Sequence, residues 1–150
     1  MAAIPRYRRA TGPTLFSAGF RPFFLLGALW AALAILIWLP AFAGEYQIPT
    51  IFPPVTWHVH EMVFGYGAAV VAGFLLTAIP NWTGRMPLQG APLAILLLLW
   101  AVGRLAVLFS AHFDAKIAAL LDLAFPLCWE RSLCCLQATC LSISMLSALP

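Results

Sequence analysis

The chain has 150 residues, of which 63% are hydrophobic and only 9% are charged, and its mean hydropathy is +0.96. Soluble domains are about 25% charged, so this composition excludes a water-soluble globular domain and indicates an integral membrane protein. The net charge of +3 is small. The basic residues cluster near the N-terminus without a nucleic-acid-binding motif around them, so we expect membrane lipids rather than nucleic acid as partners.

The chain divides into three parts. Residues 1–22 form a basic segment that contains Arg6, Arg8, Arg9 and Arg21. Residues 23–127 predict an all-α transmembrane helical bundle, with spans at about 23–43, 57–79, 91–109 and 117–127 onward, near the roughly 20 residues that a bilayer requires. With the apolar tail at 128–150 this makes about four to five spans, and we interpret the chain as a fragment of a larger bundle.

A signal peptide is an alternative interpretation of the first apolar run, because Ala41-Phe42-Ala43 fits the small-residue cleavage pattern. The run is about 20 residues long, whereas the apolar core of a signal peptide has about 7–15 residues, and residues 1–22 precede it. We therefore expect residues 23–43 to be retained as the first span.

The distribution of Lys and Arg predicts the orientation. The segment before the first span holds four arginines and the connection between the second and third spans holds Arg85, while the connection after the third span holds only Lys116. Cytoplasmic segments are enriched in Lys and Arg, so we expect a cytoplasmic N-terminus. The histidines of the chain, His58, His60 and His112, would then share the outer side of the membrane.

Residues 128–150 differ in composition from the rest of the chain. Cysteine is absent from residues 1–127, and four cysteines follow: Cys128, Cys134, Cys135 and Cys140. Their spacing matches neither a zinc site, a Cys-x-x-Cys redox motif nor an iron–sulfur site. Because free cysteine behaves as a small hydrophobe, we assign the tail no chemistry. The abrupt change also suggests the hypothesis that the reading frame shifts near Phe125.

The most informative stretch is residues 57–62, which read Trp-His-Val-His-Glu-Met. His58, His60 and Glu61 stand at the entrance of a run, 62–79, that carries no Lys, Arg, Asp or Glu. Ionisable side chains are costly inside a membrane and usually functional there, and histidine is the commonest metal ligand. The stretch predicts a metal or haem site with His58 and His60 as ligands. The alternative is a set of interfacial polar residues bonded to loops and water.

Helical geometry separates the two imidazoles. On a helix His58 and His60 point about 200° apart, which favours two roles, such as an axial haem ligand and a ligand to a second metal; an extended approach would let both bind one ion. His58 and Glu61, three residues apart, share a helical face. Glu61 is expected to orient an imidazole or to transfer a proton.

Small residues follow Glu61 at every fourth position: Gly65, Ala69, Gly73 and Thr77. Such a stripe lets a neighbouring helix or a flat macrocycle approach closely. Helix packing is the favoured interpretation of the two.

Arg104 is a lone charge inside the third span. At 1.5 Å per residue it lies roughly 8 Å from the outer end of its span, and Glu61 lies roughly 6 Å inside its own. The matched depths predict a Glu61–Arg104 ion pair or a pair between Arg104 and a haem propionate. The alternative is that Arg104 extends outward along its stem to reach water.

Three motifs in order carry a resemblance to a known family. They are FSAGFRPFF at 16–24, WHVHEM with Gly65 at 57–65, and AGFLLTAIPNWTG at 72–84, joined by Gly103-Arg104. Over about residues 14–125 the chain resembles the NnrS family. The resemblance implies a haem- and copper-containing, multi-pass bacterial inner-membrane protein associated with nitric oxide and denitrification, with His58, His60, Glu61 and Arg104 as cofactor-binding candidates. Members of the family resemble larger bundles than this chain forms, so the expected partners are the remaining helices of a longer protein or further copies of the chain. The tail does not resemble the family.

Three functions remain open from the sequence. The first is the haem/copper protein that the resemblance implies. The second is a transporter or channel module in which the same four side chains form a relay. The third is an N-terminal bundle fragment without activity of its own. No catalytic residue is assigned, and the sequence does not decide whether the protein is an enzyme.

Overall fold

The computed structural model describes residues 13–84 and 86–146, with side chains as far as residue 134. Within these residues the chain is helical and contains no strand, which confirms the predicted all-α fold. A short turn, η1 (Thr14–Ser17), leads into α1 (Phe20–Phe42). A continuous helix of 30 residues follows, built from α2 (Pro54–His60), η2 (Glu61–Gly67) and α3 (Ala68–Thr83). Then come α4 (Ala91–Leu108), the turn η3 (Ser110–His112) and α5 (Ala115–Leu146).

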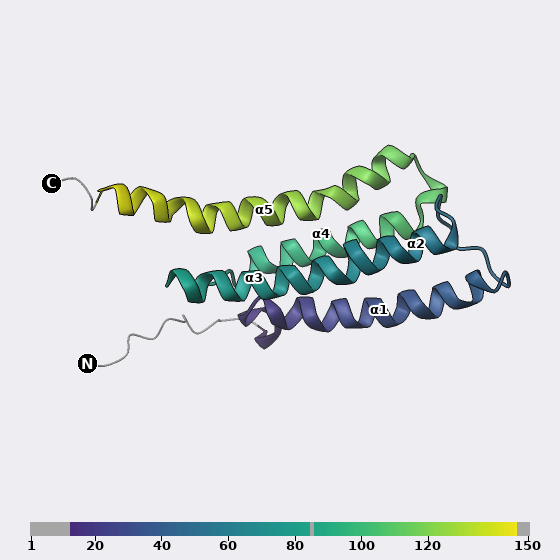
Figure 1. Ribbon diagram of the computed structural model, residues 1–150, viewed down its shortest axis with the longest axis horizontal. Coiled ribbons are helices and arrows are strands. Elements are labelled where there is room, and N and C mark those ends of the chain that lie inside the picture. The colour runs from purple at the N-terminus through teal and green to yellow at the C-terminus, as the bar shows by residue number, and fades with distance from the viewer. Residues whose placement is uncertain (1–12, 85, 147–150) are drawn as a thin grey trace.

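The helices run alongside one another as an elongated bundle (Figure 1). The α1–α2 and α4–α5 connections lie at one end, on the right in the view, and the start of α1 and the end of α3 lie at the other. Within the described residues three stretches are long and apolar enough to cross a membrane: α1, the helix Pro54–Thr83, and α4. The fourth expected span, which was predicted to fade around Leu127, is part of α5, which continues through Pro126 to Leu146.

The stripe of small residues packs against α1, so helix packing is the confirmed interpretation of this pattern. A Cβ built on Gly73 would lie 3.0 Å from the ring of Phe24, and one built on Gly27 would lie 3.1 Å from the Cβ of Ala69. Farther along, the backbone N–H of Phe20 donates to the Thr77 hydroxyl at 3.2 Å. Side chains larger than these would hold α1 and α3 apart.

Close approach also joins α4 to α5. A Cβ on Gly103 would lie 3.2 Å from the Cα of Asp122. The described part of α5 then reaches across to α1, where Phe125 packs against Phe23 with ring centroids 5.7 Å apart. Both rings belong to the buried core, together with Trp100 of α4. The polar residues at 104 and 122 are therefore brought together by a glycine contact.

Ser110 ties the α1–α2 connection to the end of α4. Its buried hydroxyl lies 3.0 Å from the Thr50 hydroxyl, accepts the N–H of Ile51 at 3.1 Å, and donates to the carbonyl of Val107. The N–H of Ala111 adds a bond to the carbonyl of Pro49. These hydrogen bonds fix the loop that carries Phe52 at the start of the second helix.

Some of the sequence features lie outside the described residues. These are Arg6, Arg8, Arg9 and Arg85, and the side chains of Cys135 and Cys140. Cys128 and Cys134 are exposed free thiols.

Overpacking the α1–α3 contact should destabilise the bundle. Ala69→Leu introduces a large side chain where Gly27 leaves room for a methyl group, and overpacking of this kind typically costs about 1–3 kcal/mol. Ala32→Leu, at an exposed position of α1, is the matched control and should leave stability unchanged. Unfolding of both variants in detergent measures the difference, and equal stability would contradict the packing described above.

The orientation is tested by cysteine labelling in a background without the native cysteines. Gln47 and Met86 are exposed at opposite ends of the helix Pro54–Thr83. If the N-terminus is cytoplasmic, an impermeant thiol reagent added outside should label Gln47→Cys and spare Met86→Cys until the membrane is opened. The reverse pattern would invert the predicted topology.

Candidate functional site

Glu61 is fully buried at the junction of α2 and η2. The indole Nε1 of Trp30, on α1, donates to its Oε2 at 2.7 Å, and Arg104 Nη1, on α4, donates to the same oxygen at 3.3 Å. The ion pair expected from the matched depths of Glu61 and Arg104 is thus formed. Arg104 is only 3% exposed, so it does not extend outward to water.

Arg104 bridges two carboxylates. Its second terminal nitrogen, Nη2, donates to Oδ1 of Asp122 on α5, the helix that Gly103 admits. Two carboxylates therefore face one guanidinium in the interior of the bundle. An isolated buried charge is strongly unfavourable, so the arrangement depends on Arg104 serving both partners.

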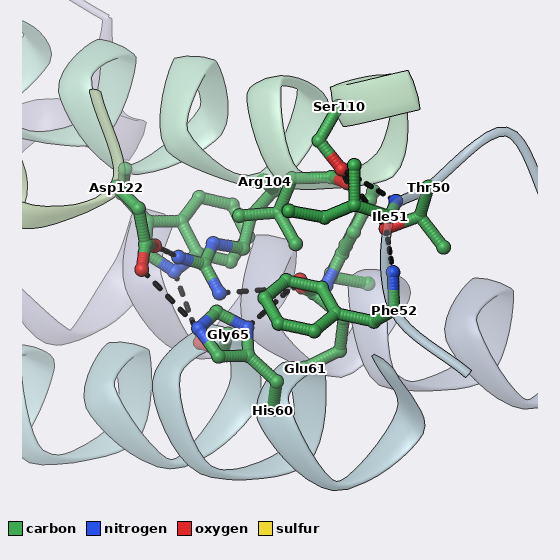
Figure 2. Close-up of polar contacts among 12 residues, drawn as sticks. Thr50, Ile51, Phe52, His60, Glu61, Gly65, Arg104, Ser110 and Asp122 are labelled. Atoms are coloured by element: carbon green, nitrogen blue, oxygen red, sulfur yellow. Dashed lines mark hydrogen bonds and ion pairs between the residues drawn. The ribbon is translucent and has the colours of Figure 1, made fainter. Parts of the chain in front are cut away.

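His60 closes these contacts into a ring. Its Nε2 lies 3.2 Å from Asp122 Oδ2, and its Nδ1 lies 3.4 Å from Glu61 Oε1. Figure 2 shows the imidazole between the two carboxylates, opposite the guanidinium. We call this set, His60, Glu61, Arg104 and Asp122, the polar ring. Its members come from α2, η2, α4 and α5, so it joins helices that are distant in sequence.

The turn at Glu61 is a π-helix rather than an α-helix. η2 spans seven residues within the second long helix, and single π turns of this kind are frequent at functional sites. The indole Nε1 of Trp100 donates to the carbonyl of Gly65 at 2.9 Å. A Cβ on Gly65 would lie 2.9 Å from Trp30 Nε1 and 3.0 Å from Glu61 Oε2. Glycine at 65 therefore gives the indole of Trp30 access to Glu61.

His58 and His60 face different neighbours, as their spacing predicts. His58 stacks on Trp38 of α1, with ring centroids 4.3 Å apart, while His60 stacks on Phe52 at 5.8 Å. His58 Nδ1 is buried and has no hydrogen-bond partner among the described residues. His58 and Glu61 both contact α1, through Trp38 and Trp30, as expected for residues that share a helical face. The imidazole that contacts the Glu61 carboxylate is nevertheless that of His60.

His112 does not join the polar ring. It is exposed in η3, where its ring lies 6.5 Å from that of Phe109. It lies at the same end of the bundle as the start of α2, because η3 is tied to the loop before α2 by the Ala111–Pro49 bond.

Two of the residues that complete the site, Asp122 and Trp30, are not predicted from the sequence. Asp122 is a lone acid in the expected fourth span, the same signal that singled out Arg104. Trp30 gives no such signal, because tryptophan is common in apolar helices and the sequence does not show which acceptor its N–H will meet. Its buried N–H requires an acceptor, and Glu61 supplies it.

The described residues offer a partial fit to a metal. Among them, no group of three or more His, Cys, Asp or Glu side chains is arranged to hold a metal ion. A hollow of about 290 Å³ lies beside the polar ring, lined by His60, Phe52, Phe64 and Asp122 among others. Small-molecule sites usually measure about 300–1,000 Å³, so a large cofactor would need further walls.

A double-mutant cycle tests the polar ring. Arg104→Gln leaves two carboxylates without their cation and should lower the free energy of unfolding by about 3–5 kcal/mol. Glu61→Gln should cost less, because Arg104 keeps Asp122, and in the double variant the two losses should not add. Lys116→Gln removes an exposed cation as the control. Additive losses would show that Glu61 and Arg104 do not interact.

Comparison with known proteins identifies the family of the chain. The family model described as NnrS protein matches residues 14–138. No curated protein and no solved structure matches significantly. The match includes Cys128 and Cys134, so the expectation that the tail departs from the family at residue 128 is wrong as far as residue 138. Because the matched region covers most of the 150 residues, the chain belongs to the NnrS family.

Proposed function

We propose that this chain holds haem and copper in a bacterial inner-membrane protein of the response to nitric oxide, and that His58 and His60 serve different metals. Membership of the family relates the chain to the nitric oxide response, and three helices within the described residues are long and apolar enough to cross a membrane. The proposal adds the cofactors, the inner membrane and the cytoplasmic N-terminus. The unpartnered imidazole nitrogen of His58 is the observation in the structure that carries it.

The imidazole of His58 is suited to bind a metal. Buried polar atoms are nearly always hydrogen-bonded, so a buried nitrogen without a partner indicates that another group belongs beside it. The ring is held by its stack on Trp38, at an interplanar angle of 19°. Imidazole is the usual proximal ligand of haem iron and also suits copper.

His60 would bind a metal in a different way, with a carboxylate that orients its ring. Histidines that bind metals commonly give their second nitrogen to a carboxylate, which orients the ring. His60 has a carboxylate at each nitrogen, so a metal on His60 would take the place of one contact and leave the other as the orienting partner. Glu61 is the better orienting group, because Trp30 and Arg104 already hold it in place.

Arg104 provides positive charge close to the imidazole of His60, because the two side chains share Glu61 and Asp122 as partners. Its terminal nitrogens are engaged by Glu61 and Asp122, while its Nε is buried and has no partner among the described residues. That Nε offers a donor to a propionate. When bound, haem and copper would supply redox chemistry and a site for a diatomic gas. The remaining ligands and walls would come from further helices of a longer protein or from a second copy.

A second candidate function, a proton or ion path, is favoured by the way His60 bridges two carboxylates. Glu61 is fully buried, whereas the side chain of Asp122 is 13% exposed. An imidazole can take a proton at one nitrogen and release it at the other, so Glu61, His60 and Asp122 form a route from the interior to the hollow beside the polar ring. Proton flux in proteoliposomes that depends on His60 without bound metal would favour this candidate.

Metal and haem content test the proposal. His58→Ala should lower haem or copper content, and His60→Ala should affect the two in a different ratio, because His58 contacts Trp38 of α1 and His60 contacts Asp122 of α5. Both should be measured in the membrane fraction from cells supplied with iron and copper, by absorption spectrum and elemental analysis. Trp38→Leu removes the ring that stacks on His58 but keeps the imidazole, so it should lower the same content by less than His58→Ala does.

The matched control is His112→Ala, which removes an exposed histidine at the same end of the bundle. It should leave both contents unchanged. Loss of metal in all three histidine variants would indicate general unfolding, and circular dichroism identifies that case. Unchanged haem and copper in both folded variants, His58→Ala and His60→Ala, would refute the assignment.

A further inference from the structure

The end of the bundle opposite the polar ring carries a polar hollow next to an apolar groove. We propose that this pair of features binds an anionic phospholipid, with its phosphate at Arg21 and an acyl chain along the groove between α1 and α3. The site is independent of the proposed haem and copper function. It shares no residue with the polar ring.

The polar hollow is built by a segment that the rest of the chain holds in place. It measures about 330 Å³ and is lined by the segment 17–21, Thr77, Pro87 and Gln89. Gln89 Nε2 donates to the carbonyl of Ser17 at 2.7 Å, and the N–H of Phe20 donates to Thr77. Beneath the segment Gly19 lies against Leu76, where a Cβ would come within 2.7 Å of the Leu76 Cβ. The walls of the hollow are therefore fixed by contacts with α3 and with the connection to α4.

Arg21 supplies the positive charge of the hollow. Its Nη1 donates to the carbonyl of Thr14 at 3.0 Å, and its guanidinium carbon lies 5.9 Å from the centre of the Phe20 ring. These contacts orient a group that carries five N–H donors, of which Thr14 takes one among the described residues. A guanidinium with free donors matches phosphate oxygens in charge and shape.

The apolar groove begins where the hollow ends. It measures about 460 Å³ and shares Phe20 and Thr77 with the hollow. One wall is formed by Phe20 and Phe24 of α1, whose ring centroids lie 6.1 Å apart. The other is formed by Phe74 and Trp82 of α3, whose ring centroids lie 6.3 Å apart. Trp82 is 71% exposed, and exposed indoles at a helix end typically lie at the membrane interface.

The combination selects an amphiphile rather than a free ion. Inorganic phosphate would use the hollow alone and leave the aromatic groove without an occupant. A phospholipid fills both, because its phosphate and acyl chain are joined at the boundary that Phe20 and Thr77 mark. Arg21 is a cation in the lining of the hollow, so the hollow favours an anionic headgroup.

Quenching of tryptophan fluorescence tests the site. The full chain, freed of lipid in a neutral detergent, is titrated with phosphatidylglycerol or phosphatidylcholine that carries brominated acyl chains, and subtraction of the Trp82→Phe signal isolates Trp82. The wild type should require about fivefold less phosphatidylglycerol than phosphatidylcholine for the same quenching, the effect of one basic residue at an anionic surface. Arg21→Gln should remove this preference, and Lys116→Gln, an exposed cation at the other end, should keep it.

Three outcomes would overturn the proposal. The first is equal quenching of wild-type Trp82 by the two lipids, a comparison that stands even where Arg21→Gln fails to fold. The second is an unchanged preference in folded Arg21→Gln. The third is that inorganic phosphate, added at the same concentration as the lipid, abolishes the preference, because the hollow would then be a phosphate site without a role for the groove.

Discussion

The arrangement of the helices depends on one side chain, Arg104, that neutralises two carboxylates from two other helices. Both terminal nitrogens of the guanidinium are used, and His60 contacts the far oxygen of each carboxylate. In a bilayer there is no water to stabilise any of these groups if one is withdrawn. The rotation and depth of the second long helix, α4 and α5 are therefore coupled, since each must present its polar residue at the same point.

The polar ring requires small residues around it. Gly103 admits α5 to α4, and Gly65 leaves room for the indole of Trp30 beside Glu61. Gly27 and Ala69 bring α1 close enough for that indole to reach. The apolar packing and the buried polar contacts are thus two consequences of the same close approach, because a hydrogen bond tolerates only a few tenths of an ångström in donor–acceptor distance.

Much of this site follows from the sequence, and the remainder has identifiable reasons for being missed. The rise of a helix is constant, so counting residues was enough to place Glu61 and Arg104 at one depth. The fourfold spacing of small residues was enough to predict close packing against a neighbouring helix, but not that this helix is α1. Asp122 was missed because it stands in the segment whose apolar character fades, and only the fold shows that this segment packs on α4. The contact of His60 with Glu61 was also missed, because it occurs where the α-helix gives way to the π turn, and the π turn leaves no local signature in the sequence.

The π turn at Glu61–Gly67 separates the long second helix into two halves with different angular settings. A π-helix turns through a smaller angle at each residue than an α-helix does, because its hydrogen bonds join residues five apart. If the seven residues of η2 became α-helical, the half that carries His58 and His60 would rotate relative to α3, and the contacts of His60 with Glu61 and Asp122 would be lost. The π conformation of this segment thus sets the direction of both imidazoles from a position that lies outside the residues that they contact.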